Sequence, residues 1–219
     1  REGRAAARAA GRAGRLPAGR GHAGAARGAP EPRGPCLLDV GTPVLPAELR
    51  SLGANVAKLV ETLDRHPGVA IRPHAKSHKT VEVAQLQLQQ PRTVGVCCQK
   101  VSEAVAMADA VGDILLSNQV VAPAKARRLA ALARRGCSVT AVVDSPQAAE
   151  VLAEAARLEG VHLGVLIDVN VGQDRCGVDG PAEAVALARA LAELEELRLR
   201  GIQAYHGAAQ HLRAYGERA

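Results

Sequence analysis

The sequence predicts an α/β fold, a (β/α)8 barrel of the TIM type that is truncated after about six strands. Short β-branched runs alternate with Ala- and Leu-rich helical runs from residue 37 onwards, which is typical of parallel sheets with right-handed crossovers. Polar residues recur directly after the strand ends. A barrel builds its site from many strand ends in this way, whereas a doubly wound sheet, the alternative fold, concentrates its site at one switch point.

The first predicted helix covers residues 46–65, where Leu and Val recur at helical spacing. Gly136 is a typical C-terminal stop for one of the later helices, and Pro146 and Pro181 are typical of the first turn of two others. Five helices separate the predicted strands, and they cover residues 80–89, 100–110, 121–135, 146–158 and 181–196.

The predicted strands are apolar almost throughout, as strands of a buried parallel sheet are. They contain the segments "GVAIR", "TVGVCC", "DILLS", "SVTAVVD", "HLGVLIDV" and "LRGIQAY". In chain order these are residues 68–72, 93–98, 113–117, 138–144, 162–169 and 199–205. An eight-stranded barrel needs two more strand-helix units, so we expect the chain to be a fragment of a longer protein.

Residues 1–36 differ in composition from the remainder and are predicted to be a disordered leader rich in Arg, Ala and Gly. Their eight arginines and two glutamates account for the net charge of +6, so residues 37–219, the predicted barrel domain, are neutral. A neutral body with 1% aromatic residues argues against nucleic-acid binding.

Five cysteines without a CxxC pair are typical of free thiols in a reducing compartment. We therefore expect a cytoplasmic protein. The alternative is an organelle, a chloroplast or mitochondrion, if the leader is a transit peptide. No apolar run approaches the roughly 18–20 residues that a membrane span needs, so no membrane partner is expected.

The stretch "RPHAKSHK" places a lysine, Lys76, four residues after the predicted strand end at Arg72. Neighbouring cations and an apolar wall disfavour the ammonium form of such a lysine, and Schiff-base chemistry needs the free amine. The alternative is an ordinary solvated loop. His74 and His78 stand four residues apart, but they fall in a loop rather than on a helix, which argues against a metal pair.

Two further clusters follow later strands. In "DVNVGQDRCGV", glycines flank Arg175, a fixed multidentate donor. In "AYHGAAQH", Tyr205 is one of only two tyrosines, and His206 and His211 follow it. The alternatives are an ordinary surface turn for the first cluster and a buried ring that caps the barrel for the second.

The motif "RPHAKSHK" resembles the pyridoxal-phosphate lysine motif of the D-threonine aldolase and D-serine dehydratase family. This family belongs to the fold-type III group, which also contains alanine racemase. The blocks "GVCCQKVSEA", "DILLSNQVV", "VNVGQDRCGV" and "GIQAYHGAAQH" are similar to the family's blocks in the same order, over residues 37–219. The blocks "CCQKVSEA" and "QAYHGAAQH" resemble the aldolase branch more than the dehydratase branch.

This resemblance implies a pyridoxal-phosphate-dependent lyase that cleaves D-β-hydroxy amino acids such as D-threonine to glycine and an aldehyde. Lys76 would form the Schiff base with the cofactor, and Arg175 would contact the cofactor's phenolic oxygen. Tyr205 would lie against or beside the pyridine ring. His211 would take the proton from the substrate's β-hydroxyl.

The resemblance also implies a divalent metal, Mn, Mg or Zn, whose His and Cys ligands lie in a β-rich C-terminal domain. We expect that domain to be absent from this chain, so no metal ligand is predicted here. Ala208 stands where the family usually carries Ser.

A D-serine dehydratase and a non-catalytic carrier of pyridoxal phosphate are the alternative functions. Alanine racemase relatives build their site across a dimer, which predicts a homodimer by analogy.

Overall fold

A parallel sheet of five strands organises residues 47–218, the part of the chain that the computed structural model describes. The sheet order is β1-β2-β3-β4-β5, so that each strand pairs with the strand before it in the chain. Consecutive order winds the chain in one direction, as in a barrel, whereas a doubly wound sheet reverses direction. The predicted barrel-type α/β fold is therefore confirmed. The strands are β1 (Val96–Cys98), β2 (Asp113–Gln119), β3 (Ser138–Val143), β4 (Leu163–Asp168) and β5 (Leu197–Gln203).

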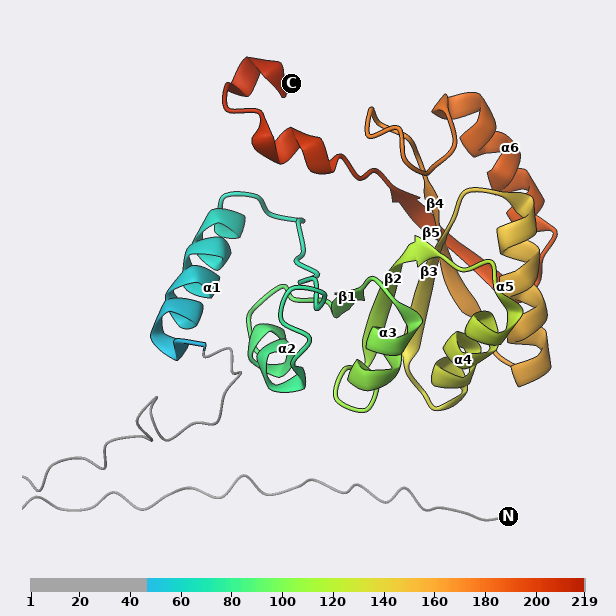
Figure 1. Cartoon of the computed structure of the whole chain (residues 1–219), viewed down its shortest axis with the longest axis horizontal. Helices are drawn as coiled ribbons and strands as arrows, with labels where there is room; N and C mark the ends of the chain where they lie inside the picture. Colours follow the sequence, from blue (N-terminus) through green and yellow to red (C-terminus); the bar gives the residue numbers. More distant parts are fainter. Residues whose placement is uncertain (1–46, 219) are drawn as a thin grey trace, which may run out of the picture. The chain divides into compact units, whose positions relative to one another are not determined.

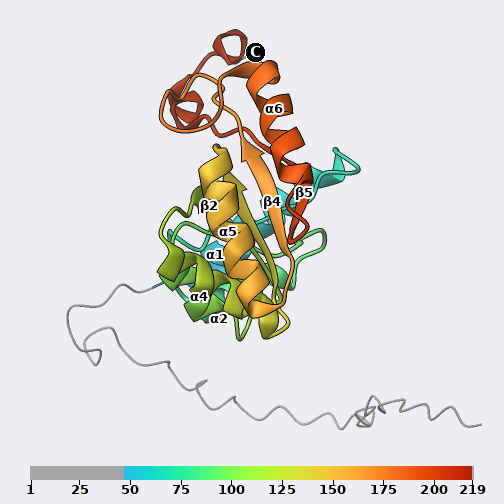
Figure 2. The same ribbon diagram turned by 90° about the vertical axis from the view of Figure 1, so that its right-hand side faces the viewer.

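The helices that connect these strands lie along one face of the sheet, as Figures 1 and 2 show for α4, α5 and α6. The α-helices are α1 (Leu49–Asp64), α2 (Val81–Leu88), α3 (Val101–Met107), α4 (Pro123–Arg134), α5 (Pro146–Glu159) and α6 (Gly180–Ala192). Two 3-10 helices, η2 (Gly207–His211) and η3 (Tyr215–Glu217), follow β5. The six predicted helices are thus confirmed, although 181–196 ends four residues earlier than predicted.

Aliphatic side chains between the sheet and the helices form the core. Along β4 the residues alternate: Leu163, Val165 and Ile167 are buried, with exposed fractions of 0%, 0% and 2%. The alternate residues, Gly164 and Leu166, are less buried and lie on the other face. The helix face of the sheet is thus packed, and the polar residues of the site lie at or beyond the carboxyl ends of the strands.

The predicted strand 68–72 is wrong, and the described sheet has five strands instead of six. Residues 68–74 make two isolated parallel bridges, Ile71 with Thr93 and His74 with Cys97, and only the first falls within the predicted strand. Pro73 lies between the two bridging residues and has no N–H to donate, which interrupts the ladder. The register also slips by one residue between the two bridges, so a regular strand cannot form here. The predicted leader, 1–36, and the domain boundary at residue 37 lie outside the described residues.

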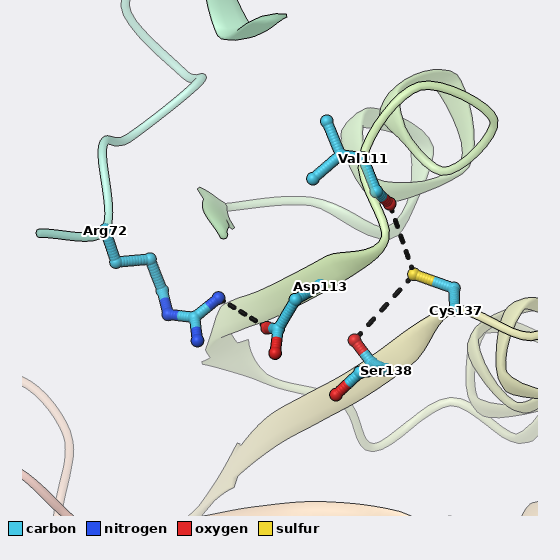
Figure 3. Close-up of polar contacts among 5 residues, drawn as sticks. All are labelled: Arg72, Val111, Asp113, Cys137 and Ser138. Carbon is cyan, nitrogen blue, oxygen red and sulfur yellow. Dashed lines mark hydrogen bonds and ion pairs between the residues drawn. The ribbon is translucent and has the colours of Figure 1, made fainter. Parts of the chain in front are cut away.

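An ion pair joins this irregular segment to β2. Arg72 Nη1 lies 2.6 Å from Asp113 Oδ1, and both side chains are largely shielded, with exposed fractions of 24% and 30% (Figure 3). Gly95 lies against the pair and has a φ of +139°, a conformation that residues with a side chain rarely adopt. A Cβ on Gly95 would lie 2.6 Å from the Asp113 carbonyl oxygen and would also collide with the Arg72 guanidinium. A side chain at this position would therefore strain the backbone and displace the ion pair.

Gly95→Ala should lower the free energy of unfolding by about 1–3 kcal/mol, because the new methyl group meets backbone at a strained φ. The measurement is urea unfolding of the purified protein. Gly112→Ala is the matched control, since a Cβ on Gly112 meets nothing within 4 Å and its φ lies outside the strained range. Equal destabilisation by the two substitutions would contradict this packing.

Candidate functional site

A cavity of about 220 Å³ lies at the carboxyl ends of β1, β2 and β5. In a barrel this is the end where loops and strand termini combine into a site. Most of its lining residues have polar side chains, and three of them were predicted from the sequence as site residues: Lys76, Arg175 and Tyr205. The lining residues are His74, Lys76, Cys97, Gln99, Ser117, Asn118, Arg175, Gln203, Ala204 and Tyr205.

Backbone hydrogen bonds fix the segment that carries Lys76. The Cys97 N–H donates to the Pro73 carbonyl, and the Ala75 N–H donates to the Cys97 carbonyl, both over 2.8 Å. After Lys76 the chain turns back, since the Lys79 N–H donates to the Ala75 carbonyl over 2.8 Å and Lys79 has a φ of 51°. The Lys76 backbone is therefore held at the end of β1, while its side chain is exposed at the cavity.

His74 joins this segment to the neighbouring strands. The Lys76 N–H donates to His74 Nδ1 over 3.3 Å, and His74 Nε2 lies 3.3 Å from Ser117 Oγ. Burial and then the charge of Lys76 lower the pKa of His74, which favours the neutral ring. Because Nδ1 accepts, the single proton lies on Nε2 and is donated to Ser117 Oγ. The Ser117 hydroxyl in turn donates to the Cys98 carbonyl over 3.2 Å.

The cations near Lys76 in the sequence do not all surround it in space. Arg72 pairs with Asp113, and it is absent from the lining of the cavity. Lys79 lines a separate surface pocket with Lys100. The sequence-based argument for a cationic cluster around Lys76 therefore fails for Arg72 and Lys79.

Arg175 and Tyr205 form the opposite part of the lining. The guanidinium carbon of Arg175 lies 5.1 Å from the centroid of the Tyr205 ring, a cation–π distance. The loop that carries Arg175 is closed by a bridge between Val169 and Val178. Inside this loop the Asn170 carboxamide oxygen accepts from two backbone N–H groups, those of Gly172 and Asp174, each over 3.1 Å. These contacts fix the backbone of the loop from which the exposed Arg175 side chain extends.

His211 does not line the cavity. It is exposed at the end of the 3-10 helix η2, which begins two residues after Tyr205. The same helix is tied to the arginine loop, because the Ala208 N–H donates to Gln173 Oε1 over 3.2 Å. The structure thus gathers Lys76, Arg175 and Tyr205 and leaves His211 at a neighbouring position on the surface.

Sequence reasoning missed Cys97 and Gln203, which lie inside predicted strands. Apart from these two, the polar lining follows a signal that was visible in the sequence, because Gln99, Ser117 and Asn118 all stand at predicted strand ends. No sequence signal marks Gln203, the last residue of β5, because burial does not alternate along this strand and only Leu197 is buried.

Cofactor chemistry can be tested against this lining. Pyridoxal phosphate carries an aldehyde, an anionic phenolic oxygen and a flat ring. The cavity offers an amine from Lys76, a permanently charged guanidinium from Arg175 and an aromatic side chain from Tyr205. The donor set therefore fits this group. Within residues 47–218 no cluster of three or more His, Cys, Asp or Glu residues could hold a metal ion.

The consecutive sheet and the lysine at the carboxyl end of β1 define an α/β barrel domain with its site at the strand ends. The chain belongs to the family described as "Alanine racemase, N-terminal domain", which matches residues 48–218. Its relatives include fold-type III enzymes that depend on pyridoxal phosphate, as the motif "RPHAKSHK" predicted. None of the helices within residues 47–218 is long and apolar enough to cross a membrane.

Relatives of known activity include aldolases. The chain is 42% identical over 191 residues to D-threonine aldolase of Arthrobacter sp., which covers 87% of this chain and 50% of the relative. It is 41% identical over 181 residues to 3-hydroxy-D-aspartate aldolase of Paracoccus denitrificans, which covers 82% of this chain and 46% of the relative. The chain therefore spans about half the length of these relatives.

The crystal structure of D-threonine aldolase from Filomicrobium marinum is similar to this fold. The TM-score is 0.78 at 39% sequence identity, over 83% of this chain and 48% of the other. A solved aldolase thus contains an arrangement of strands and helices like that of residues 47–218.

The thiols of the described residues differ in their surroundings. Cys97, Cys98 and Cys137 are buried, whereas Cys176 is exposed beside Arg175. Burial raises the pKa of all three buried thiols, and that of Cys98 rises to about 12. Cys137 directly precedes β3, and its Sγ lies 3.5 Å from the Val111 carbonyl oxygen (Figure 3). Because the thiolate is the reactive form, the three buried thiols are protected twice, by burial and by protonation.

In a Cys36→Ser background, a water-soluble disulfide reagent at neutral pH should label Cys176 more than about tenfold faster than the three buried cysteines. The reaction is followed by absorbance, and the labelled site is identified by peptide mapping. Removing Cys176 as Cys176→Ser should abolish the fast phase and leave the slow phases in place. Fast labelling of Cys98 in the folded protein would be incompatible with its burial.

Proposed function

We propose that the protein is a pyridoxal-phosphate-dependent lyase that cleaves D-β-hydroxy amino acids, such as D-threonine, to glycine and an aldehyde. The observation that carries the proposal is the shared cavity of Lys76, Arg175 and Tyr205, which come from three separate segments of the chain. The aldolase activity of the similar proteins supports the reaction type.

Three side chains would hold the cofactor. Lys76 Nζ would attach covalently to the aldehyde carbon, Arg175 would pair with the phenolic oxygen, and Tyr205 would contact the ring. Once bound, the cofactor supplies an electron sink for the negative charge that develops at the substrate's Cα. The hydrogen bonds of His74 and the pinned backbone around Lys76 would keep the amine in place for attachment.

His211 would act as the base that takes the proton from the substrate's β-hydroxyl. It is exposed beside the cavity rather than in its wall, on a short helix tied to the Arg175 loop. Catalytic side chains often reach their final hydrogen-bond distance only when substrate is bound, so this position is compatible with the role. His74 is less suited to it, because both of its ring nitrogens already have partners.

Within residues 47–218 no suitable cluster of metal ligands is found. A divalent metal at the β-hydroxyl would therefore need ligands from outside these residues. Its role would be that of a Lewis acid which helps the hydroxyl lose its proton. The homodimer and the cytoplasmic location remain predictions from the sequence.

Lys76→Arg should abolish covalent trapping of pyridoxal phosphate by borohydride, because a guanidinium does not condense with the aldehyde. Peptide mapping of the reduced protein locates the adduct. Lys79→Arg is the matched control, since Lys79 is three residues away and lies outside the cavity, and it should keep the adduct. An adduct that survives Lys76→Arg would refute the assignment of the amine.

His211→Ala should lower kcat for D-threonine cleavage by about 10²–10⁴-fold and leave the trapped cofactor on Lys76 unchanged. Glycine formation is the assay, and pyruvate formation from D-serine is measured alongside it. His162→Ala is the control, because His162 precedes β4 at the opposite end of the strands and should leave the rate unchanged. Pyruvate from D-serine without glycine from D-threonine would favour the dehydratase over the aldolase.

A further inference from the structure

Asp168 is a buried carboxylate at the end of β4, with an exposed fraction of 5%. Two amide side chains face it. Gln119 Nε2 donates to Asp168 Oδ2 over 2.8 Å, and Gln203 Nε2 donates to Asp168 Oδ1 over 3.0 Å. Because a carboxylate only accepts hydrogen bonds, each glutamine must turn its nitrogen towards Asp168 and its oxygen away. Asp168 therefore settles the orientation of both amides.

Gln203 and Gln119 differ in one respect that matters for binding: Gln203 lines the cavity and Gln119 does not. The Gln203 nitrogen also lies 3.5 Å from the Ser117 carbonyl oxygen, so both of its hydrogens are directed at the protein. The polar atom that Gln203 has left for a bound molecule is Oε1, an acceptor. The charged groups of the lining, Lys76 and Arg175, are donors.

We propose that Gln203 Oε1 accepts a hydrogen bond from an N–H or O–H donor of the molecule bound in the cavity. Asp168 is a positioning residue that keeps this oxygen turned towards the cavity. The inference rests on the proposed function and assigns a further contact to the same site. The donor is either the β-hydroxyl of the substrate or an N–H of the cofactor's ring. In either case the cavity selects against an anionic or purely apolar group at this point. Gln203 Oε1 would repel an anionic group, and it would have no hydrogen-bond donor opposite an apolar group.

A pair of ligands that differ by one hydroxyl separates these two donors. D-Threonine carries the β-hydroxyl, and D-2-aminobutyrate has the same carbon chain without it. Dissociation constants are measured by rapid-mixing titration of the cofactor-loaded protein, from the change in its visible absorption before turnover. Retention of pyridoxal phosphate is measured separately by dilution.

Gln203→Leu removes the acceptor, and Gln119→Leu is the matched control that removes the other amide from Asp168 outside the cavity. If the substrate is the donor, Gln203→Leu should weaken D-threonine binding by roughly 3- to 10-fold and leave D-2-aminobutyrate binding unchanged. If the cofactor is the donor, Gln203→Leu should speed cofactor loss by a similar factor. The Gln119→Leu protein keeps Gln203 and its bond to Asp168, so it should change either measurement by less than Gln203→Leu does.

Asp168→Asn tests the positioning role without removing the acceptor. An asparagine can present either its oxygen or its nitrogen to Gln203. Asp168→Asn should therefore change the same quantity as Gln203→Leu, either the dissociation constant of D-threonine or the rate of cofactor loss, in the same direction by a smaller factor. It also serves as the test if Gln203→Leu fails to fold, which thermal unfolding detects. Unchanged ligand and cofactor binding in folded Gln203→Leu, with wild-type trapping on Lys76 intact, would overturn this inference alone. Absence of trapping in the wild type would overturn the proposed function and this inference together.

Discussion

The site depends on two backbone hydrogen bonds that pin an irregular segment to the edge strand β1. The bonds join Pro73 and Ala75 to Cys97, and both are 2.8 Å long. They place the backbone of Lys76 one residue beyond the pinned segment, so that its side chain begins at the carboxyl end of the sheet. Pro73 prevents a regular strand here, yet its carbonyl still accepts one of the two bonds. The segment is thus hydrogen-bonded to β1 just before the turn at Lys76, although it does not form a continuous ladder with that strand.

Ser117 links the parts of the site that come from different strands. Its hydroxyl lies between His74 and the Cys98 carbonyl, and its own carbonyl lies near the Gln203 amide. Polar contacts of this kind are costly to leave incomplete inside a protein, so each member restrains the next. The lysine segment, the second strand and the fifth strand are therefore coupled through one residue, although they are far apart in the sequence.

The sequence was sufficient for the fold class and the six helices, because strand-helix alternation is a local pattern. It also named Lys76, Arg175 and Tyr205, which line one cavity, while the roles of the proposed site residues stay predictions. It failed at 68–72, where an apolar, β-branched segment resembles a strand but Pro73 and a register slip interrupt the ladder. It also gave no means of knowing that Arg72 turns to Asp113, since that contact joins residues 41 positions apart. Gln203 was missed for a related reason: its orientation comes from Asp168 on another strand. Pairings across the sheet decide these features, and a single sequence does not display them.

The site residues fall into two groups with different supports. Lys76, Ser117 and Gln203 are fixed by the sheet or by direct bonds to it. Arg175 and Tyr205 lie on connections beyond β4 and β5 that are held by Asn170 and by the Gln173–Ala208 contact. Strand-borne groups keep their positions because moving them breaks the ladder, whereas the connections can shift while the ladder stays intact. In the proposed function, attachment at Lys76 would therefore use the rigid part of the fold, whereas Arg175 and Tyr205 would contact the ring from connections that can adjust.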